Sequence, residues 1–351
     1  MPPVEPIRTP LSVLDLVPVG AGIPPAVALR RTTELAQLAD RLGLVRYWFA
    51  EHHGMPGIAS SSPEILIEHI ASATNTIRVG SGGIMLPNHA PLRIAEAFHT
   101  LEALHPGRID LGIGRAPGTD PITSSALRPF DAEQFASQLA ELIALSRGTF
   151  PPDHQFHRVR VVPAGVTLPP IWMLGSSGAS ARFAGSLGLG YAFARHFSPS
   201  PPEPAIRAYR EAFTPSPQFP TSHVVLGVSV ICAETDAEAD YLARTIDLVW
   251  VRYQRGEFAA LPTPEDASAY PYTAQDLATV QSNRAKHFIG SPAHVVAQIR
   301  DLIESTGADE IMVTTMVHDH AARLRSYELL VGAFDASFSS HLPVAAREYS
   351  R

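Results

Sequence analysis

Short apolar runs alternate with amphipathic segments along almost the whole chain. The apolar runs are rich in Val, Ile and Leu, which is typical of strands buried on both faces of a parallel sheet. The segments between them repeat apolar residues at the three-to-four-residue spacing of a helix. We therefore expect strands at residues 11–17, 45–50, 77–84, 108–113, 171–174, 191–194, 224–233 and 310–315, and helices at residues 27–42, 63–73, 92–104, 130–146, 178–187, 204–213, 237–253, 292–305 and 320–338.

Eight strands that alternate with helices are typical of a (β/α)8 TIM barrel, which is an α/β fold. A doubly wound sheet is the alternative, and the count of eight strands favours the barrel. The 351 residues fit one barrel, so we expect a single domain over residues 1–351 with two insertions. One insertion, at residues 147–169, follows the fourth strand. The other, at residues 256–283, precedes the eighth strand and contains Pro262, Pro264 and Pro271.

Composition and charge exclude several classes of protein. The chain has 27 basic and 34 acidic residues, a net charge of −7, and no basic run of the kind that binds nucleic acid. No apolar run is long enough to cross a membrane, and the N-terminus lacks the apolar core of a signal peptide. The single cysteine, Cys232, lies in an apolar run, where a buried thiol is expected. These features predict a cytoplasmic protein that binds neither nucleic acid nor a membrane.

The third strand ends in a pair of glycines, Gly82-Gly83, and ligands of α/β barrels bind at the carboxyl ends of the strands. Glycine in a strand often marks a bulge or a close approach of the backbone to a ligand. A simple bend at a barrel corner is the alternative, and we weigh the two equally. The residues that follow, which include Met85, are apolar and suit a flat aromatic ligand better than a sugar or an ion.

The next two strand ends could together bind an anion. The fourth strand ends at Arg115, whose guanidinium could pair with a phosphate in the barrel mouth; a surface salt bridge is the alternative. After the fifth strand, Ser176, Ser177 and Ser180 lie with two glycines at the start of a helix. Free backbone N–H groups and the helix dipole favour an anion at such a position. A plain N-cap explains one of these serines but not all three.

Glu51, His52 and His53 follow the second strand. Adjacent residues of a strand point to opposite sides, and the chain lacks the usual zinc spacings, so we expect no metal site. One histidine that faces the barrel mouth could act as a general base or hydrogen-bond donor, whereas a solvated loop histidine is the alternative. His196, at the end of the sixth strand, is a weaker candidate of the same kind. The remaining histidines of interest are interpreted as structural or exposed: His89, His105 and His287.

These segments, in this order, resemble the bacterial luciferase-like flavin monooxygenase family, and within it the single-chain luciferase family oxidoreductase group 1. The resemblance runs from the first strand to about residue 338 and is specific only when its motifs are taken jointly. The motifs are YWFAEHH at 47–53, VGSGGIMLPNHAPLRIAE at 79–96, PGRIDLGIGRAPG at 106–118, GSSGASARFAGSLGLGYAFA at 175–194 and GSPAHVVAQIRDLIESTGADEIMV at 290–313.

The resemblance implies a role for each candidate residue. Gly82-Gly83 falls where the family has a non-prolyl cis peptide against the flavin ring, with Met85 beside it. His52 falls on the catalytic histidine, which Glu51 and His53 would support. Glu51, His53 and His196 are also our weaker candidates for contact with the substrate. The residues implied to hold the flavin phosphate are Arg115, Ser176, Ser177 and Ser180.

The same resemblance implies a two-component monooxygenase. Reduced FMN, made by a separate flavin reductase, would react with O2 to give a C4a-peroxide that oxidises an organic substrate. Residues 256–283 would form a mobile lid that excludes water, and the chain would form a homodimer. Within the family, hydride transfer with the deazaflavin F420 is one alternative, and a flavin-binding or storage protein without turnover is another. A metal-dependent barrel hydrolase would need His and Asp ligands at several strand ends, whereas the sequence offers one cluster.

Overall fold

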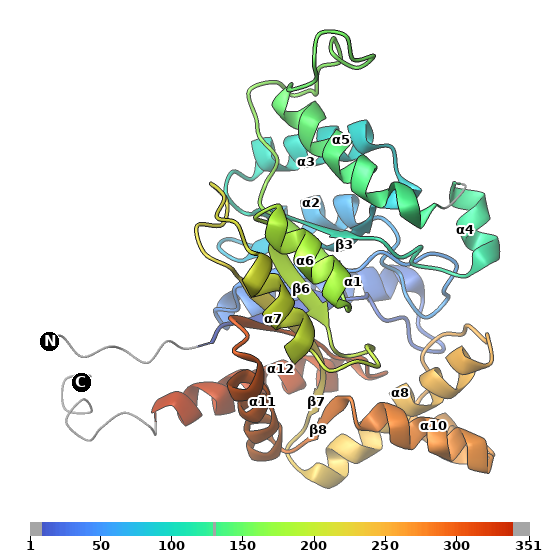
Figure 1. Cartoon of the computed structure of the whole chain (residues 1–351). Coiled ribbons are helices and arrows are strands. Elements are labelled where there is room, and N and C mark those ends of the chain that lie inside the picture. Colours follow the sequence, from blue (N-terminus) through green and yellow to red (C-terminus); the bar gives the residue numbers. More distant parts are fainter. Residues whose placement is uncertain (1–8, 129–130, 340–351) are drawn as a thin grey trace, which may run out of the picture.

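Eight parallel strands close into a barrel in the computed structural model, which describes residues 9–128 and 131–339 (Figure 1). The sheet closes because β1 pairs with β9 and β6 pairs with β7, which excludes the doubly wound alternative and confirms the predicted barrel. Each barrel strand lies within two residues of its predicted bounds. The barrel strands are β1 (Leu11–Asp15), β2 (Arg46–Phe49), β3 (Arg78–Met85), β4 (Ile109–Gly114), β5 (Ile171–Gly175), β6 (Gly190–Ala194), β7 (Val224–Cys232) and β9 (Glu310–Thr314).

Amphipathic helices cover the outside of the barrel (Figure 1). Several begin with proline in their first turn, where the missing N–H would have no helical partner, and two end at a glycine with positive φ, Gly148 and Gly307. The predicted helix 130–146 starts at a position outside the described residues. The covering helices are α1 (Pro25–Arg41), α2 (Pro63–Ala73), α3 (Pro91–Leu104), α5 (Phe135–Arg147), α6 (Gly178–Ser186), α7 (Glu203–Ala212), α8 (Asp236–Gln254), α11 (Pro292–Thr306) and α12 (His320–Ser339).

Several short elements were missed by the sequence pattern. Two single turns, η1 (Leu86–Asn88) and η2 (Ala132–Gln134), and a short helix, α4 (Pro121–Leu127), flank the strand ends. Residues 256–283, where no helix was predicted, contain α9 (Pro264–Ala269) and most of α10 (Ala274–Arg284). A ninth strand, β8 (His287–Gly290), pairs with the carboxyl-terminal half of β7 and lies outside the closed barrel. The insertion predicted at 147–169 is confirmed, since residues 148–169 follow α5 without regular strands or helices.

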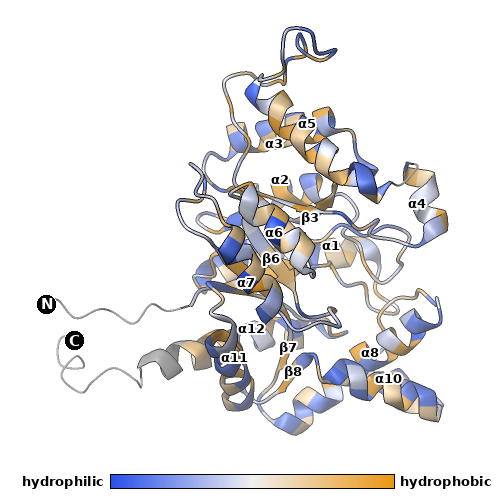
Figure 2. Cartoon of the chain, viewed as in Figure 1, coloured by the Kyte–Doolittle hydropathy of each residue, from blue (hydrophilic) through white to orange (hydrophobic). Residues whose placement is uncertain are grey.

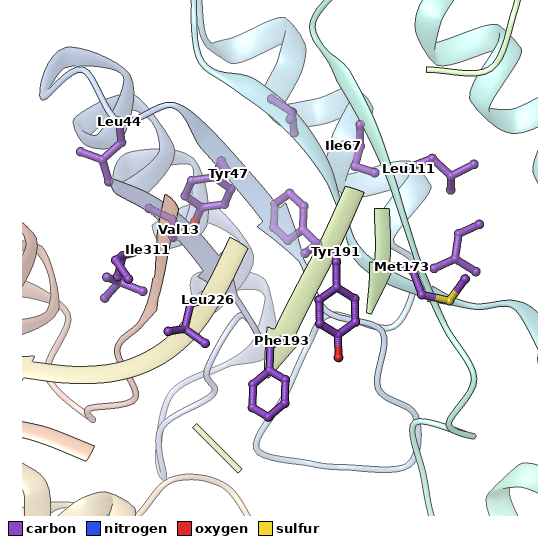
Figure 3. Packing of buried hydrophobic residues seen from close by; sticks show 14 of the residues in the cluster. Val13, Leu44, Tyr47, Ile67, Leu111, Met173, Tyr191, Phe193, Leu226 and Ile311 are labelled. Atoms are coloured by element: carbon purple, nitrogen blue, oxygen red, sulfur yellow. The ribbon is translucent and has the colours of Figure 1, made fainter. Parts of the chain in front are cut away.

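The core follows the alternation of side chains along each strand. One set of strand side chains packs outward against the helices in a single large cluster, and Figure 3 shows members such as Val13, Tyr47 and Leu226 projecting from their strands. The opposite set fills the inside of the barrel, where Leu14, Trp48 and other residues form a smaller cluster. Figure 2 shows the matching colours, with hydrophobic strands surrounded by helices of mixed hydropathy. In the described part of the chain, no helix has the length and hydropathy needed to cross a membrane.

A buried ion network closes the amino-terminal end of the barrel. Arg46 donates to Asp110 at 2.8 Å and to Glu310 at 2.9 Å, and Arg78 also pairs with Asp110. Ser12 donates to Glu310 as well. Burial opposes the charge on each carboxyl, but Arg46 holds the pKa of both Asp110 and Glu310 below the usual range. Charged groups therefore fill this end, and the open space of the barrel lies at the other.

Candidate functional site

A cavity of about 1410 Å³ occupies the carboxyl-terminal mouth of the barrel. Every barrel strand contributes to its wall, as expected for the functional face of this fold. Most of the wall is apolar. The strand residues that line it include Leu14, Trp48, Gly82, Gly114, Leu174, Ala192, Val225 and Met312.

The Gly82-Gly83 peptide bond is cis, as the family resemblance predicted, and it lies in the cavity wall. The pairing register between β3 and β4 shifts between Ser81 and Ile84, so the strand bulges here and continues to Met85 rather than ending at the glycines. A Cβ on Gly82 would lie 2.7 Å from Leu14 Cδ1, and one on Gly83 would lie 2.6 Å from the Gly112 carbonyl. The backbone of the neighbouring strand therefore requires glycine at position 83, whereas a side chain at position 82 would have to displace the end of Leu14. Gly82 presents bare backbone to the cavity.

Arg115 and the start of α6 lie on the same cavity wall, as the sequence predicted for an anion site. Arg115 is exposed, and no carboxylate of the described residues lies within 4.0 Å of it. Ser177 is exposed and caps α6 by accepting from the Ser180 N–H at 3.4 Å, while Ser176 is half-buried at the turn before it. A cation without an acidic partner, facing a helix start rich in hydroxyls, fits a phosphate group.

Glu51 and His53 do not line the cavity, which corrects our expectation that they could contact the substrate. The Glu51 side chain is fully buried and accepts hydrogen bonds from His53 Nε2 at 2.8 Å, His89 Nε2 at 2.9 Å and the Met85 N–H at 2.8 Å. Burial opposes its charge, but these hydrogen bonds lower the pKa of Glu51 to about 2. Glu51 therefore fixes the loop after β2 against the bulge of β3 from behind.

His52 points the other way and lines the cavity. Its backbone N–H donates to the Ser60 carbonyl at 2.9 Å, which holds the loop in place. The Nδ1 atom is buried and has no hydrogen-bond partner. Burial lowers the pKa of His52 to about 4, so the ring is neutral at pH 7. A neutral imidazole with a free nitrogen can donate to or accept from a ligand in the cavity.

His196 and His287 line the same cavity, and both carry a buried Nδ1 without a partner. His196, a weak candidate from the sequence, lies beside Gly227 of β7. His287 was interpreted as structural or exposed; it is not exposed, because β8 carries it, buried, into the cavity wall opposite Ser229. Since β8 was not expected, no sequence signal pointed His287 at the cavity. Burial lowers the pKa of each ring to about 4.

These buried neutral histidines predict a loss of stability in mild acid. Their folded pKa of about 4 lies below the unfolded value, so between these values the unfolded chain binds more protons and stability falls as pH falls. From pH 7 to pH 5, His196 and His287 should each remove about 2 kcal/mol from the free energy of unfolding. Denaturant unfolding of the wild type and of His196→Gln/His287→Gln would measure this. An equally steep pH dependence in the double variant would contradict it.

The segment before α9 closes one side of the cavity. Residues 257–261 line the wall, and Leu261 donates its N–H to the Val19 carbonyl at 2.8 Å and accepts from the Ala21 N–H at 2.7 Å. A Cβ on Gly57 would lie 2.6 Å from the Ala259 carbonyl, so the segment also packs on the loop after β2. Among the residues that the structure describes, no group of His, Cys, Asp and Glu is arranged to hold a metal ion.

Relatives of known family match nearly the whole chain. A luciferase-like monooxygenase of Escherichia coli (strain K12) is 40% identical over 91% of this chain and 95% of its own length. An N-acetyl-S-alkylcysteine monooxygenase of Bacillus subtilis (strain 168) is 32% identical over 92% of this chain and 97% of its own. The crystal structure of apo-MsnO8 superposes with a TM-score of 0.83 at 40% identity, covering 93% and 98% of the two chains.

More distant structures share the fold and carry two different cofactors. The oxygenating constituent of 3,6-diketocamphane monooxygenase from Pseudomonas putida, in complex with FMN, has a TM-score of 0.67 at 21% identity over 93% of this chain and 97% of its own. An F420-dependent secondary alcohol dehydrogenase has a TM-score of 0.64 at 13% identity over 93% of this chain and 99% of its own. The family model for luciferase-like monooxygenase matches residues 9–310. With this match and these relatives, the chain is an enzyme of the luciferase-like monooxygenase family.

Proposed function

We propose that this enzyme is the oxygenating component of a two-component system that uses reduced FMN and O2. The balanced reaction consumes reduced FMN, O2 and an organic substrate, and it yields FMN, water and a product with one added oxygen atom. We call Arg115 and the three serines Ser176, Ser177 and Ser180 the phosphate cradle. The observation that carries the proposal is that this cradle and the bare backbone of Gly82 line one large, mostly apolar cavity. Bound reduced FMN would supply the electrons for oxygen activation.

The cavity offers a place for each part of FMN. The flat ring would lie against the bulge at Gly82, where the glycine leaves no side chain in the way. The phosphate would be held by Arg115 together with Ser176, Ser177 and Ser180, and Met85 would pack beside the ring. His52 would face the reacting edge with its unpartnered Nδ1. The apolar wall would exclude water from the reacting groups.

Loss of the Arg115 guanidinium should weaken FMN binding. Arg115→Ala removes a charge-assisted hydrogen bond to the phosphate, so the binding free energy should fall by about 1–3 kcal/mol, or about 5- to 150-fold in Kd. Anaerobic titration with reduced FMN measures this. Arg158→Ala, which removes an exposed arginine from the loop after α5, is the matched control. An unchanged affinity in Arg115→Ala would remove this residue from the phosphate site.

The relatives support FMN over F420, since four of them are named as monooxygenases. F420 remains the alternative because the fold alone serves both cofactors. The deciding experiment is anaerobic titration of the protein with reduced FMN, followed by rapid mixing with O2 and assay of H2O2. We expect tight binding of reduced FMN and an oxidation rate that differs from free flavin. Failure to bind reduced FMN, with binding of reduced F420 instead, would replace the proposal by hydride transfer.

Storage without turnover would show itself in the same experiment as binding of FMN without any change when organic substrates are added. An oxygenated product, identified by mass spectrometry with ¹⁸O2, would exclude storage. A flavin reductase would be needed to supply reduced FMN, and any reductase that releases it should sustain turnover. Turnover only with one dedicated reductase in physical complex would contradict free transfer of the flavin.

Residues 256–283 would act as a lid over the loaded site. The segment reaches the cavity through residues 257–261, whose backbone hydrogen bonds to the barrel are those of Leu261, while α9 and α10 pack on α8. Closure would exclude water while the oxygen chemistry proceeds. Homodimer formation is a separate part of the proposal. Ile65 on α2 and Leu104 on α3 are exposed at 66% and 58%, which supports an apolar contact at these helices.

A further inference from the structure

Two cations line the cavity on the side of α8 and β8. Arg252, near the end of α8, and Lys286, directly before β8, both belong to the wall. Both side chains are half-buried. Within the described ranges 9–128 and 131–339, no carboxylate lies within 4.0 Å of either side chain, and neither side chain makes a hydrogen bond. A partly buried cation without a partner carries a desolvation cost that a ligand of opposite charge would offset.

Neighbouring arginines that do not line the cavity, in contrast, are paired with aspartates. Arg255, three residues after Arg252, pairs with Asp276 at 2.7 Å. Arg284, two residues before Lys286, pairs with Asp247 at 2.7 Å and with Asp240. The aspartates of α8 and α10 therefore neutralise the cations that face away from the cavity. The wall also carries Glu133 and Glu257, but both are exposed and neither approaches the two cavity cations within 4.0 Å.

The two cations are distinct from the phosphate cradle. Arg115 follows β4 and the three serines follow β5, whereas Arg252 and Lys286 lie beside β7 and its partner β8. The end of β6 separates the two groups around the barrel. One cavity therefore has two positively charged places, and the FMN of the proposed function would occupy the first.

The wall next to Arg252 and Lys286 suits an amphiphilic ligand. Its apolar part includes Val249, Trp250 and Phe258. Its polar part includes buried atoms without partners, among them His196 Nδ1, His287 Nδ1, Thr314 Oγ1 and the indole Nε1 of Trp250. Buried polar atoms are normally hydrogen-bonded, so these atoms indicate where a polar group of a ligand would lie.

We propose that the substrate is an organic acid whose apolar body lies over the flavin and whose carboxylate binds Arg252 and Lys286. This inference rests on the proposed function, because it assigns to the substrate the part of the cavity that FMN would leave free. The guanidinium of Arg252 can bind a carboxylate through two N–H groups, while the Lys286 ammonium adds a point charge. His196 and His287, both neutral, can hydrogen-bond polar groups between the carboxylate and the ring.

The test compares two probes of the same length, decanoate and 1-decanol, by isothermal titration at pH 7.5 and low salt. We expect the wild type to bind decanoate about 10-fold or more tightly than decanol, the scale of a charge-assisted hydrogen bond. In Arg252→Gln/Lys286→Met the ratio should fall to about 1, with decanol affinity unchanged. Arg207→Gln, which removes an exposed charge on α7 outside the cavity, should keep the wild-type ratio.

Each other result overturns the assignment. A wild type that binds both probes equally, or a double variant that keeps the preference, would show that these cations do not bind carboxylates. Weaker binding of reduced FMN to the double variant would instead assign Arg252 and Lys286 to the cofactor. All titrations are made with and without FMN, so the probe ratio is measured even if FMN fails to bind. Failure of the proposed function is thereby separated from failure of the organic-acid site.

Discussion

Replacement of Arg46 by methionine should lower the free energy of unfolding by about 3–5 kcal/mol, the range for removal of one partner from a buried ion pair. Asp110 and Glu310 are both fully buried, and Arg46 is the cation that joins them. Without Arg46, Glu310 would keep the Ser12 hydroxyl and the ring of His223, whose Nε2 lies 3.3 Å from its carboxylate. Neither group replaces a permanent positive charge. Urea unfolding at pH 7.5 measures the change.

The pH dependence of this variant gives a second and independent check. Without Arg46, the folded pKa of Glu310 should rise above its unfolded value, because burial then acts without the opposing cation. A raised folded pKa means that the folded state binds the extra proton, so the stability deficit should shrink as pH falls. Adding Glu310→Gln to Arg46→Met should also recover part of the loss at pH 7.5. Arg30→Met, on the exposed face of α1, is the control. A deficit no larger than that of the control at pH 7.5 would show that the network contributes little.

The barrel was predictable because its signal is repeated along the chain. Apolar runs such as residues 224–233 are too short for helices and are flanked by helical spacing, and the closed sheet follows from eight such units. The position of Arg115 and the serines on one cavity wall could also be predicted, since they follow the ends of two neighbouring strands. The cis Gly82-Gly83 bond and the proposed role of His52 came from the family resemblance, as the glycine pair alone was equally consistent with a simple bend.

The parts that were missed depend on contacts between distant segments. β8 has four residues and becomes a strand only because β7 is long enough to pair with it after leaving the barrel. His287 and Lys286 line the cavity because of this pairing, so the hydrophobic pattern of the sequence could not predict their position. Arg252 lies on a helix whose inward face is known only once α8 is packed. Glu51 was predicted to contact the substrate, but its carboxylate instead accepts hydrogen bonds from two histidines and a backbone N–H.

The division of charge between the two ends of the barrel links stability to function. At the amino-terminal end, Arg46 is matched by two buried carboxylates, so its charge serves the fold. At the mouth, Arg115, Arg252 and Lys286 line the cavity, and no acidic partner lies within 4.0 Å among the described residues. Variants of the first group should therefore change unfolding, and variants of the second should change ligand binding with little effect on unfolding.

Replacement of His52 by alanine should lower formation of the oxygenated product by about 10²- to 10⁴-fold, the range for loss of a positioned acid–base group. The affinity for reduced FMN should stay within about twofold, because His52 follows β2, whereas Arg115 and the serines follow β4 and β5 on the other side of β3. The measurement is product formed per reduced FMN consumed, with H2O2 as the uncoupled product. His69→Ala, which removes a histidine paired with Thr33 at the protein surface, is the control.

Because the unpartnered nitrogen of His52 is Nδ1, the two amide substitutions of this residue should differ in their effect. Since Nδ1 is the buried atom without a partner, an asparagine amide can place a hydrogen-bonding group near the same position, whereas a glutamine amide extends toward the position of Nε2. His52→Asn should therefore recover more coupling than His52→Gln. Because burial keeps the ring neutral, with a pKa of about 4, coupling in the wild type should not follow a titration near pH 6.5. Equal recovery by both amides would show that Nδ1 is not the atom that matters. A coupling transition near pH 6.5 that His52→Asn abolishes would show that His52 acts as a charged acid rather than as a neutral hydrogen-bonding group.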